Sequence, residues 1–272
     1  MPTEFYKMTG SGNDFVMLDG RIHQVADWPA ERIVAVCDRR NGVGADGFVV
    51  LTPVTDGRVR MSFFNSDGSE AAMCGNAALC STVLATTLGM VSSAGMELVT
   101  GAGAFPTRCL GTSQASLNLP DFLPPRDPGI PKAPGEDEIW LATVGVPHLT
   151  VLVHNVEKVD LPSRGRELRF HPGAGPAGAN VNFVAPAPGG PGSRWLMRTY
   201  ERGVEGETLA CGTGAVASAV ALGGSGRGSL PAVIITRGGR PLEIRALIGP
   251  SQASQVWLTG EGRLVFRGIL SD

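Results

Sequence analysis

Leu209-Ala-Cys-Gly-Thr-Gly-Ala215 leads directly into the uncharged apolar run from Val216 to Leu222. This pattern predicts a strand-like segment that ends at Cys211, followed by a helix from Ala215 to Leu222. Because the helix would begin just after the thiol, the unpaired backbone N–H groups of its first turn would lie beside Cys211. Such a helix N-terminus favours an anion, either a thiolate or a bound carboxylate.

The same pattern occurs a second time, nearer to the start of the chain. Met73-Cys-Gly-Asn-Ala-Ala-Leu79 repeats it, and an almost wholly apolar helix is predicted from Ala77 to about Thr87. The preceding strands also correspond, because Met61-Ser-Phe-Phe-Asn65 resembles Met197-Arg-Thr-Tyr-Glu201. A helix without a charged face is expected to be buried on all sides.

Many short predicted strands surround each of these two helices. The predicted fold class is α/β (α+β), with two pseudo-symmetric halves, each a mostly antiparallel sheet or barrel wrapped around a central apolar helix. Pro120–Glu138 is rich in proline and is the predicted domain linker. Residues 186–193 are predicted to form a mobile loop of proline and glycine. If the halves face each other, the two thiols converge on one cleft, which is the predicted active site.

Composition excludes several classes of function. The chain has 272 residues, of which 43% are hydrophobic and 18% charged, and its net charge is −2. The absence of a basic block argues against a nucleic acid partner. No apolar run approaches the roughly 20 residues of a membrane span, so no membrane partner is expected. Five cysteines, an odd number, without a signal peptide predict a cytoplasmic protein with reduced thiols.

No metal site and no cofactor are predicted. Cys74 and Cys80 would lie on different faces of one helix, so they cannot share a ligand face. Gly212-x-Gly214-x-x-Ala217 resembles part of a dinucleotide-binding motif. However, no Asp or Glu occurs between Gly212 and Leu242, where that motif needs an acidic residue.

Two thiols that face each other across a cleft suit a two-base proton transfer. One thiolate would remove a proton from a carbon and the other thiol would supply a proton to the opposite face, which inverts a stereocentre. The carbon acid would be the α-position of an amino acid. The helix N-termini would lower the thiol pKa and bind the carboxylate on which negative charge grows. The predicted backbone donors are Gly75, Asn76, Gly212, Thr213 and Gly214.

The other cysteines and histidines are weaker candidates. Cys37, Cys80 and Cys109 have apolar neighbours and are predicted to be core residues. His148 follows Gly145-Val-Pro147 at a predicted junction between a loop and a strand. On its own, His148 is equally consistent with a structural and a functional role.

Five motifs in this chain resemble the diaminopimelate epimerase family, and together they span most of its length. The motifs are Lys7-Met-Thr-Gly-Ser-Gly-Asn-Asp-Phe15, Asn41-Gly-Val-Gly-Ala-Asp-Gly47, Phe64-Asn-Ser-Asp-Gly-Ser-Glu-Ala-Ala-Met-Cys-Gly-Asn76, Asn180-Val-Asn-Phe183 and Glu201-Arg-Gly-Val-Glu-Gly-Glu-Thr-Leu-Ala-Cys-Gly-Thr-Gly214. The resemblance implies a PLP-independent isomerase that interconverts LL- and meso-2,6-diaminopimelate in lysine biosynthesis. It also implies a homodimer, and a last strand that returns to the first half. The predicted domains are therefore residues 1–119 plus 261–272, and residues 120–260.

The resemblance also assigns roles to individual residues. Cys74 and Cys211 would be the catalytic acid/base pair, and His148 and Glu201 would modulate their pKa. The reacting carboxylate would be held by Gly75, Asn76, Gly212 and Thr213. The rest of the substrate would be held by Asn13, Asn65, Asn180, Glu201 and Arg202. Polar residues in loops, Asn in particular, often stabilise the loop instead.

Four positions depart from the pattern of the family. Val146 stands where many relatives carry Asn, and Gly47 stands where some carry Gln. Glu205 resembles a one-residue insertion, and Phe266 stands where some relatives have a dimer-interface Tyr. These departures leave the chemistry intact but are compatible with a different amino acid substrate.

Three alternative functions remain open at this point. A related cofactor-independent racemase would act on proline or hydroxyproline, although those enzymes resemble Cys-Gly-His where this chain has Cys74-Gly-Asn76. A thiol hydrolase would use Cys211 as nucleophile and His148 as base, which leaves Cys74 unexplained. A non-catalytic protein would bind an amino acid without exchanging its α-hydrogen.

Overall fold

The computed structural model describes residues 3–188 and 192–270 and has a mixed α+β fold dominated by strands. The chain divides into two compact units. The first unit comprises Met1–Asn118 and Thr259–Asp272, and the second comprises Leu119–Leu258. The predicted proline- and glycine-rich loop at residues 186–193 lies partly outside the described residues.

The first unit is a sheet in which antiparallel pairs predominate. Its strands are β1 (Thr3–Gly10), β2 (Asn13–Asp19), β3 (Gly47–Thr55), β4 (Arg58–Asn65), β5 (Glu70–Ala71), β6 (Met96–Thr100), β7 (Gly103–Cys109), β8 (Gln114–Leu119) and β17 (Arg263–Leu270). The pairs β1–β2, β3–β4, β4–β5, β6–β7 and β7–β8 are antiparallel, whereas β2–β3 and β4–β6 are parallel. β17 pairs antiparallel with β1, so the last strand of the chain joins the first.

The second unit repeats this order of strand pairings. Its strands are β9 (Glu136–Val144), β10 (Val146–Val153), β11 (Asn180–Pro186), β12 (Arg194–Glu201), β13 (Gly206–Thr208), β14 (Ala232–Ile235) and β15 (Pro241–Ile248), and β16 (Ala253–Glu261) leads back to the first unit. Here β10–β11 and β12–β14 are parallel, whereas β9–β10, β11–β12, β12–β13 and β14–β15 are antiparallel. The identical order of pairing types confirms the predicted pseudo-symmetry.

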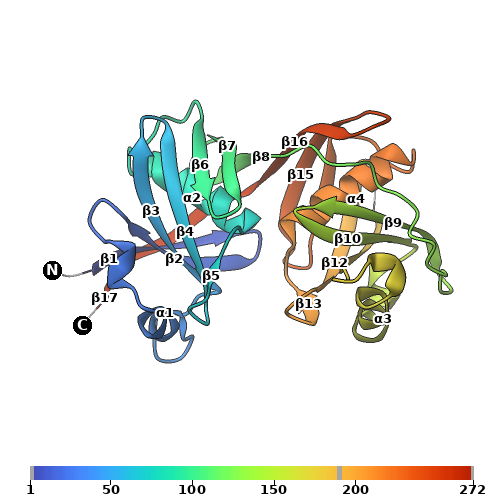
Figure 1. The fold of residues 1–272 in the computed structure, drawn as a ribbon, viewed down its shortest axis with the longest axis horizontal. Helices are drawn as coiled ribbons and strands as arrows, with labels where there is room; N and C mark the ends of the chain where they lie inside the picture. The colour runs from blue at the N-terminus through green and yellow to red at the C-terminus, as the bar shows by residue number, and fades with distance from the viewer. Residues whose placement is uncertain (1–2, 189–191, 271–272) are drawn as a thin grey trace. The chain divides into compact units, whose positions relative to one another are not determined.

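Each unit contains one long helix at the same place in this order. α2 (Gly75–Thr87) follows β5, and α4 (Gly212–Gly224) follows β13. Every residue of Asn76–Ala85 and of Gly214–Leu222 is buried, which confirms the prediction that both helices are enclosed on all sides. In Figure 1 the strands of each unit curve around its long helix. Both helices begin earlier than predicted, at the glycine that directly follows the cysteine.

Shorter helices cover the outer face of each sheet. Ile33 and Val36 of α1 (Ala30–Cys37) pack with Val16 and Phe48 of the first unit. In the second unit, Leu168 of α3 (Arg166–Arg169) belongs to the corresponding outer cluster. The alternation of side chains along each strand leaves the other face of the sheet for the long helix.

The proline-rich segment predicted to be a linker is attached to the second unit. Phe122 forms an isolated antiparallel bridge with Ala253, and Arg126 forms one with Leu141. Backbone hydrogen bonds of 2.8–3.1 Å support both bridges. Residues 120–135 are therefore part of a folded unit rather than a free tether.

Burial of the long helices predicts a large stability difference between two matched variants. Leu79 in α2 is 0% exposed, whereas Val54 in β3 is 43% exposed. Leu79→Ala should lower the free energy of unfolding by about 2–5 kcal/mol, because it removes contacts and leaves a cavity. Val54→Ala should change it by less than about 0.5 kcal/mol. Urea denaturation followed by circular dichroism measures both values, and equal effects would contradict the enclosed position of α2.

Candidate active site

The two predicted catalytic cysteines occupy equivalent positions, each at the N-cap of a buried helix. Their backbones are extended, with φ −140° and ψ 120° at Cys74 and φ −131° and ψ 104° at Cys211. The first helical hydrogen bonds run from Ala78 N to Cys74 O and from Ala215 N to Cys211 O, both at 2.9 Å. The N–H groups between these residues therefore have no partner within the helix. Both side chains are present as thiols; Cys211 is buried and Cys74 is half-buried.

Strand register brings the other predicted residues of the first unit to one end of its sheet. Phe15 of β2 pairs with Gly47 of β3, and Gly47 pairs with Asn65 of β4. Asn13 begins β2 and Asn65 ends β4. Because β2 and β3 are parallel while β4 is antiparallel to β3, these positions share the edge of the sheet from which the loop to Cys74 departs.

Asn13 is held at both ends of its carboxamide. Its Nδ2 donates to Asp46 Oδ2 at 3.0 Å, and its Oδ1 accepts from Asn76 Nδ2 at 2.7 Å. Asp46 in turn accepts from Arg39 Nη2 at 2.7 Å. Asn13 therefore retains one N–H and one lone pair for a ligand. Asn76 Oδ1 is buried and has no hydrogen-bond partner among the described residues.

A charged cluster supports this end of the first unit, and sequence reasoning did not assign it a role. Lys7 Nζ donates to Asp14 Oδ2 at 2.7 Å and to the carbonyl of Gly44. Arg39 donates to both carboxylate oxygens of Asp14. Burial alone would raise the pKa of Asp14, but the hydrogen bonds from Arg39 and Lys7 lower it to about 2. Lys7, Gly44 and Asp14 lie within motifs quoted above, whereas Arg39 carried no sequence signal.

The second unit has the equivalent arrangement at the end of its sheet. His148 of β10 pairs with Asn180 of β11, and Val181 pairs with Tyr200 of β12. Glu201, the last residue of β12, therefore lies at the same edge as His148 and Asn180. The turn and short strand that follow lead to Cys211, as the loop after Asn65 leads to Cys74.

His148 is fully buried, and its environment keeps it neutral. Burial, reinforced by the positive charge of Arg202, lowers its pKa from 6.5 to about 3. Its Nδ1 lies 3.4 Å from Asn182 Nδ2. Its Nε2 has no hydrogen-bond partner among the described residues. His148 is therefore an uncharged hydrogen-bonding group at neutral pH.

Glu201, Arg202 and Asn180 make contacts of different kinds. Burial raises the pKa of Glu201, and a 2.6 Å hydrogen bond from Thr208 Oγ1 to Glu201 Oε2 partly offsets this effect. Asn180 Oδ1 accepts from the backbone N–H of Arg202 at 2.7 Å, so Asn180 stabilises the turn that carries Arg202. The guanidinium of Arg202 forms no hydrogen bond with any of the described residues.

The first turn of α4 packs directly against a buried amide. A Cβ on Gly214 would lie 2.4 Å from Asn182 Oδ1, so only glycine allows this approach. Asn182 Nδ2 donates to Leu149 O at 3.1 Å, and its Oδ1 accepts from Thr199 Oγ1 at 2.9 Å. Asn182 thus positions the helix that begins at Cys211. Sequence reasoning included it in a motif but gave it no role. In the same turn, the Sγ atom of Cys211 lies 3.8 Å from Oγ1 of Thr213.

The absence of a side chain at Gly47 also has a structural reason. A Cβ there would lie 2.6 Å from the ring of Phe63 and 2.8 Å from Phe64 O. A residue with a side chain at this position would therefore require these groups to move. Asn65 Nδ2 donates a 3.0 Å hydrogen bond to Ser69 Oγ, which leaves the side-chain oxygen Oδ1 of Asn65 available.

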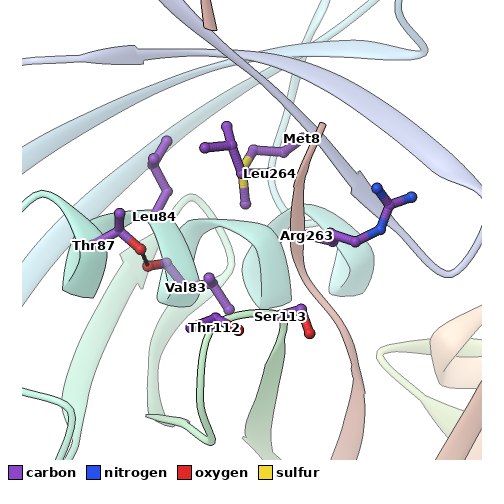
Figure 2. A pocket seen from close by; sticks show the side chains of 8 residues that line it. All are labelled: Met8, Val83, Leu84, Thr87, Thr112, Ser113, Arg263 and Leu264. Carbon is purple, nitrogen blue, oxygen red and sulfur yellow. Dashed lines mark hydrogen bonds between the residues drawn. The ribbon is translucent and has the colours of Figure 1, made fainter. Parts of the chain in front are cut away.

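A separate cavity of about 470 Å³ lies beside the second half of α2. Figure 2 shows that it is lined by Met8, Val83, Leu84, Thr87, Thr112, Ser113, Arg263 and Leu264. Val83 follows Cys74 by about 13 Å along the helix, at 1.5 Å per residue. None of the predicted site residues lines this cavity, so it is not the site predicted from the sequence.

Residues 3–188 and 192–270 contain no group of three or more His, Cys, Asp and Glu side chains placed to hold a metal ion. Among the helices they form, none has the length and apolar character needed to span a membrane.

Comparison with known proteins identifies the family. The sequence model described as "Diaminopimelate epimerase" matches residues 5–114 and 140–246. A protein named diaminopimelate epimerase from Gemmatimonas aurantiaca is 45% identical over 276 residues, which covers 98% of this chain and 99% of the relative. The chain belongs to the diaminopimelate epimerase family.

Other matches agree with this assignment and confirm the resemblance seen in the sequence. The diaminopimelate epimerase of Aquifex aeolicus is 38% identical, covering 99% of this chain and 98% of that protein. Among solved structures, a phenazine biosynthesis protein of the PhzF family from Enterococcus faecalis matches with a TM-score of 0.74, 15% identity and full coverage of both chains. That likeness shows a shared fold only.

The buried, neutral state of His148 predicts that acid destabilises the fold. Its pKa is about 3 in the folded protein against 6.5 in the unfolded chain. Between these values the unfolded state binds more protons, so the free energy of unfolding falls as pH drops from about 6.5 to about 3. One such group accounts for roughly 2 kcal/mol between about pH 7 and about pH 5. Urea denaturation at both pH values should show a smaller loss for His148→Gln than for the wild type. Equal losses would contradict the neutral state of the imidazole.

Proposed function

We propose that this protein interconverts LL- and meso-2,6-diaminopimelate in lysine biosynthesis by moving the α-proton between the side chains of Cys74 and Cys211. The observation that carries the proposal is the repeated placement of a thiol at the N-cap of a buried, uncharged helix, once in each unit, in a member of this family. In this proposal the chemistry belongs to the two side chains, without PLP or another cofactor.

Proton transfer at the α-carbon requires an acid and a base on opposite faces. One cysteine acts as thiolate and removes the proton, while the other donates a proton to the opposite face. The α-proton of an amino acid is weakly acidic, so the negative charge that develops on the carboxylate must be stabilised. The unpaired N–H groups of Gly75, Asn76, Gly212 and Thr213 supply that stabilisation. The same helix N-termini favour the thiolate form.

Polar side chains at the ends of the strands bind the rest of the substrate in this proposal. Arg202 is suited to the carboxylate at the non-reacting end, because its guanidinium has no competing hydrogen bond among the described residues. Neutral His148 and protonatable Glu201 adjust the pKa of the thiols. The remaining contacts come from Asn13, Asn65 and Asn180.

We also propose that the protein works in the cytoplasm on a small-molecule amino acid. Both catalytic thiols must stay reduced for the mechanism to operate, and reducing compartments maintain that state. Neither a nucleic acid nor a membrane takes part in the proposed reaction.

Substitution of either cysteine tests the proposed mechanism. Proton NMR in D₂O with LL-diaminopimelate should show loss of the α-hydrogen signal and appearance of the meso isomer with the wild type. Cys74→Ala and Cys211→Ala should each lower the rate of epimerisation by about 10²–10⁴-fold, because each removes an acid/base group. Cys109→Ala is the control, since this half-buried cysteine lies outside the proposed site, and its rate should equal that of the wild type.

Other outcomes of the same experiment identify the alternatives. Turnover of proline or hydroxyproline without turnover of diaminopimelate would indicate the related racemases. Retained activity in Cys74→Ala, together with an acyl adduct on Cys211, would indicate a thiol hydrolase. Binding without any α-hydrogen exchange in the wild type would indicate a binding protein.

We further propose a homodimer that uses exposed apolar side chains of β17. Val265 and Phe266 are each 46% exposed and Ile269 is 67% exposed. Phe266 also packs edge-to-face on Phe5 of β1, with ring centroids 5.8 Å apart. Exposed apolar side chains gathered on one strand are typical of protein interfaces.

Charge placed on β17 tests the proposed dimer. Ile269→Arg should convert a dimer to a monomer in sedimentation-velocity or light-scattering measurements, because a charged group would be buried without a partner. Leu123→Arg is the control, since Leu123 is 78% exposed but lies in the second unit. A wild type that sediments as a monomer at all concentrations would refute the proposal.

A further inference from the structure

A buried arginine of α3 is tied to the turn that joins β12 and β13. Arg169 is only 8% exposed, and its Nε donates to Glu205 Oε1 at 3.2 Å. Its Nη1 donates to Ala177 O at 3.0 Å, and its Cζ lies 4.5 Å from the centre of the Phe170 ring. Glu205 lies at the surface of the turn, with its side chain 33% exposed, so the ion pair links the buried guanidinium of Arg169 to the solvent-facing side of this turn.

Glu205 uses the same carboxylate oxygen to hold the turn itself. Oε1 also accepts a hydrogen bond from the backbone N–H of Gly203 at 3.1 Å. The backbone N–H of Glu205 donates to Glu201 O at 2.8 Å. Glu205 adopts φ 55°, a left-handed conformation that costs a non-glycine residue about 1–2 kcal/mol. Such a conformation persists where surrounding contacts enforce it, as they do here.

Arg202 is the residue that these contacts hold in place. Its backbone N–H is fixed by Asn180, and Gly203, the next residue, is fixed by Glu205. Its guanidinium, in contrast, hydrogen bonds to none of the described residues. The backbone of the turn is therefore held in place, while the partly buried guanidinium of Arg202 keeps its hydrogen-bond donors available. This combination suits bidentate binding of a carboxylate.

We propose that the Arg169–Glu205 ion pair is a clasp that positions Arg202 for the carboxylate at the non-reacting end of the substrate. Glu205 is then a positioning residue and acts only through Arg202. This inference rests on the proposed function, because it takes Arg202 to contact the substrate. The clasp affects binding of the ground state and of the transition state equally, so its loss raises KM and leaves kcat unchanged.

Steady-state kinetics with LL-diaminopimelate test the clasp. Glu205→Ala should raise KM about tenfold and change kcat by less than about twofold. Glu205→Gln keeps a neutral acceptor for Arg169 and Gly203, so its KM should rise only about threefold. Glu205→Gly removes the same carboxylate but relieves the positive φ. It should match Glu205→Ala if the carboxylate, and not backbone strain, is responsible.

Two controls separate positioning from a general structural effect. Glu243→Gln removes a carboxylate that pairs with exposed Arg245 in the same unit, and it should leave KM unchanged. In an Arg202→Ala background, Glu205→Ala should add less than about twofold to KM, because the residue through which it acts is gone. An equal rise in both backgrounds, or an unchanged KM in Glu205→Ala, would overturn the inference.

Amide hydrogen exchange distinguishes failure of the clasp from failure of the proposed function. In the substrate-free protein, the Gly203 N–H should exchange at least about tenfold faster in Glu205→Ala than in the wild type. If the wild type does not epimerise diaminopimelate, the proposed function fails. The exchange rates of the Gly203 and Arg202 amides then test by themselves whether the Arg169–Glu205 clasp holds the turn. Unchanged exchange at both amides would overturn it.

Discussion

The unsatisfied N-terminus of a buried helix is the constraint on which the rest of the structure depends. α2 and α4 start inside their sheets, and neither cysteine at the N-cap makes a side-chain capping hydrogen bond. Ser, Thr, Asp or Asn at these positions would have paired with the N–H groups of the first turn. Cysteine leaves those donors available, so a thiolate or a bound carboxylate can pair with them. In the proposed function, stability is lost at these two helix ends and each end gains the capacity to bind an anion.

The hydrogen bonds that each polar side chain makes distinguish residues that support the candidate site from residues that can bind a ligand. Asn182 is engaged through both ends of its amide and packs against Gly214, so its role is to position α4. Asn13 is engaged at both ends as well, and its orientation is set by Asp46 and Asn76. Arg202, by contrast, keeps an open guanidinium on a fixed backbone. The same sequence motifs therefore contain residues that support the candidate site and residues that can bind a ligand. Sequence similarity alone does not show which residue has which role.

Local sequence patterns predicted the enclosed helices, because an uncharged apolar run has only one stable environment. They placed the helix starts too late, since Gly212 and Gly75 suggest a loop, whereas the first turn of a helix tolerates glycine. Sequence resemblance supplied the candidate site residues, but not the partners that orient them. Arg39 pairs with Asp14 and Arg169 pairs with Glu205, 25 and 36 positions away in the sequence, so only the tertiary structure shows these pairs. The burial that keeps His148 neutral is likewise a property of the folded sheet and not of its neighbours in sequence.

The pairing of β17 with β1 has a consequence for the order in which the chain folds during synthesis. β1 precedes the second unit in the sequence, whereas its partner β17 follows that unit. The second unit is a single continuous segment, Leu119–Leu258, and all of its internal contacts are available before β17 exists. Domains usually complete folding in the order in which they emerge. Here most of the first unit is translated earlier, but β1 lacks its partner on one side until β17 has emerged, and an unpaired strand edge is exposed to pairing with other chains.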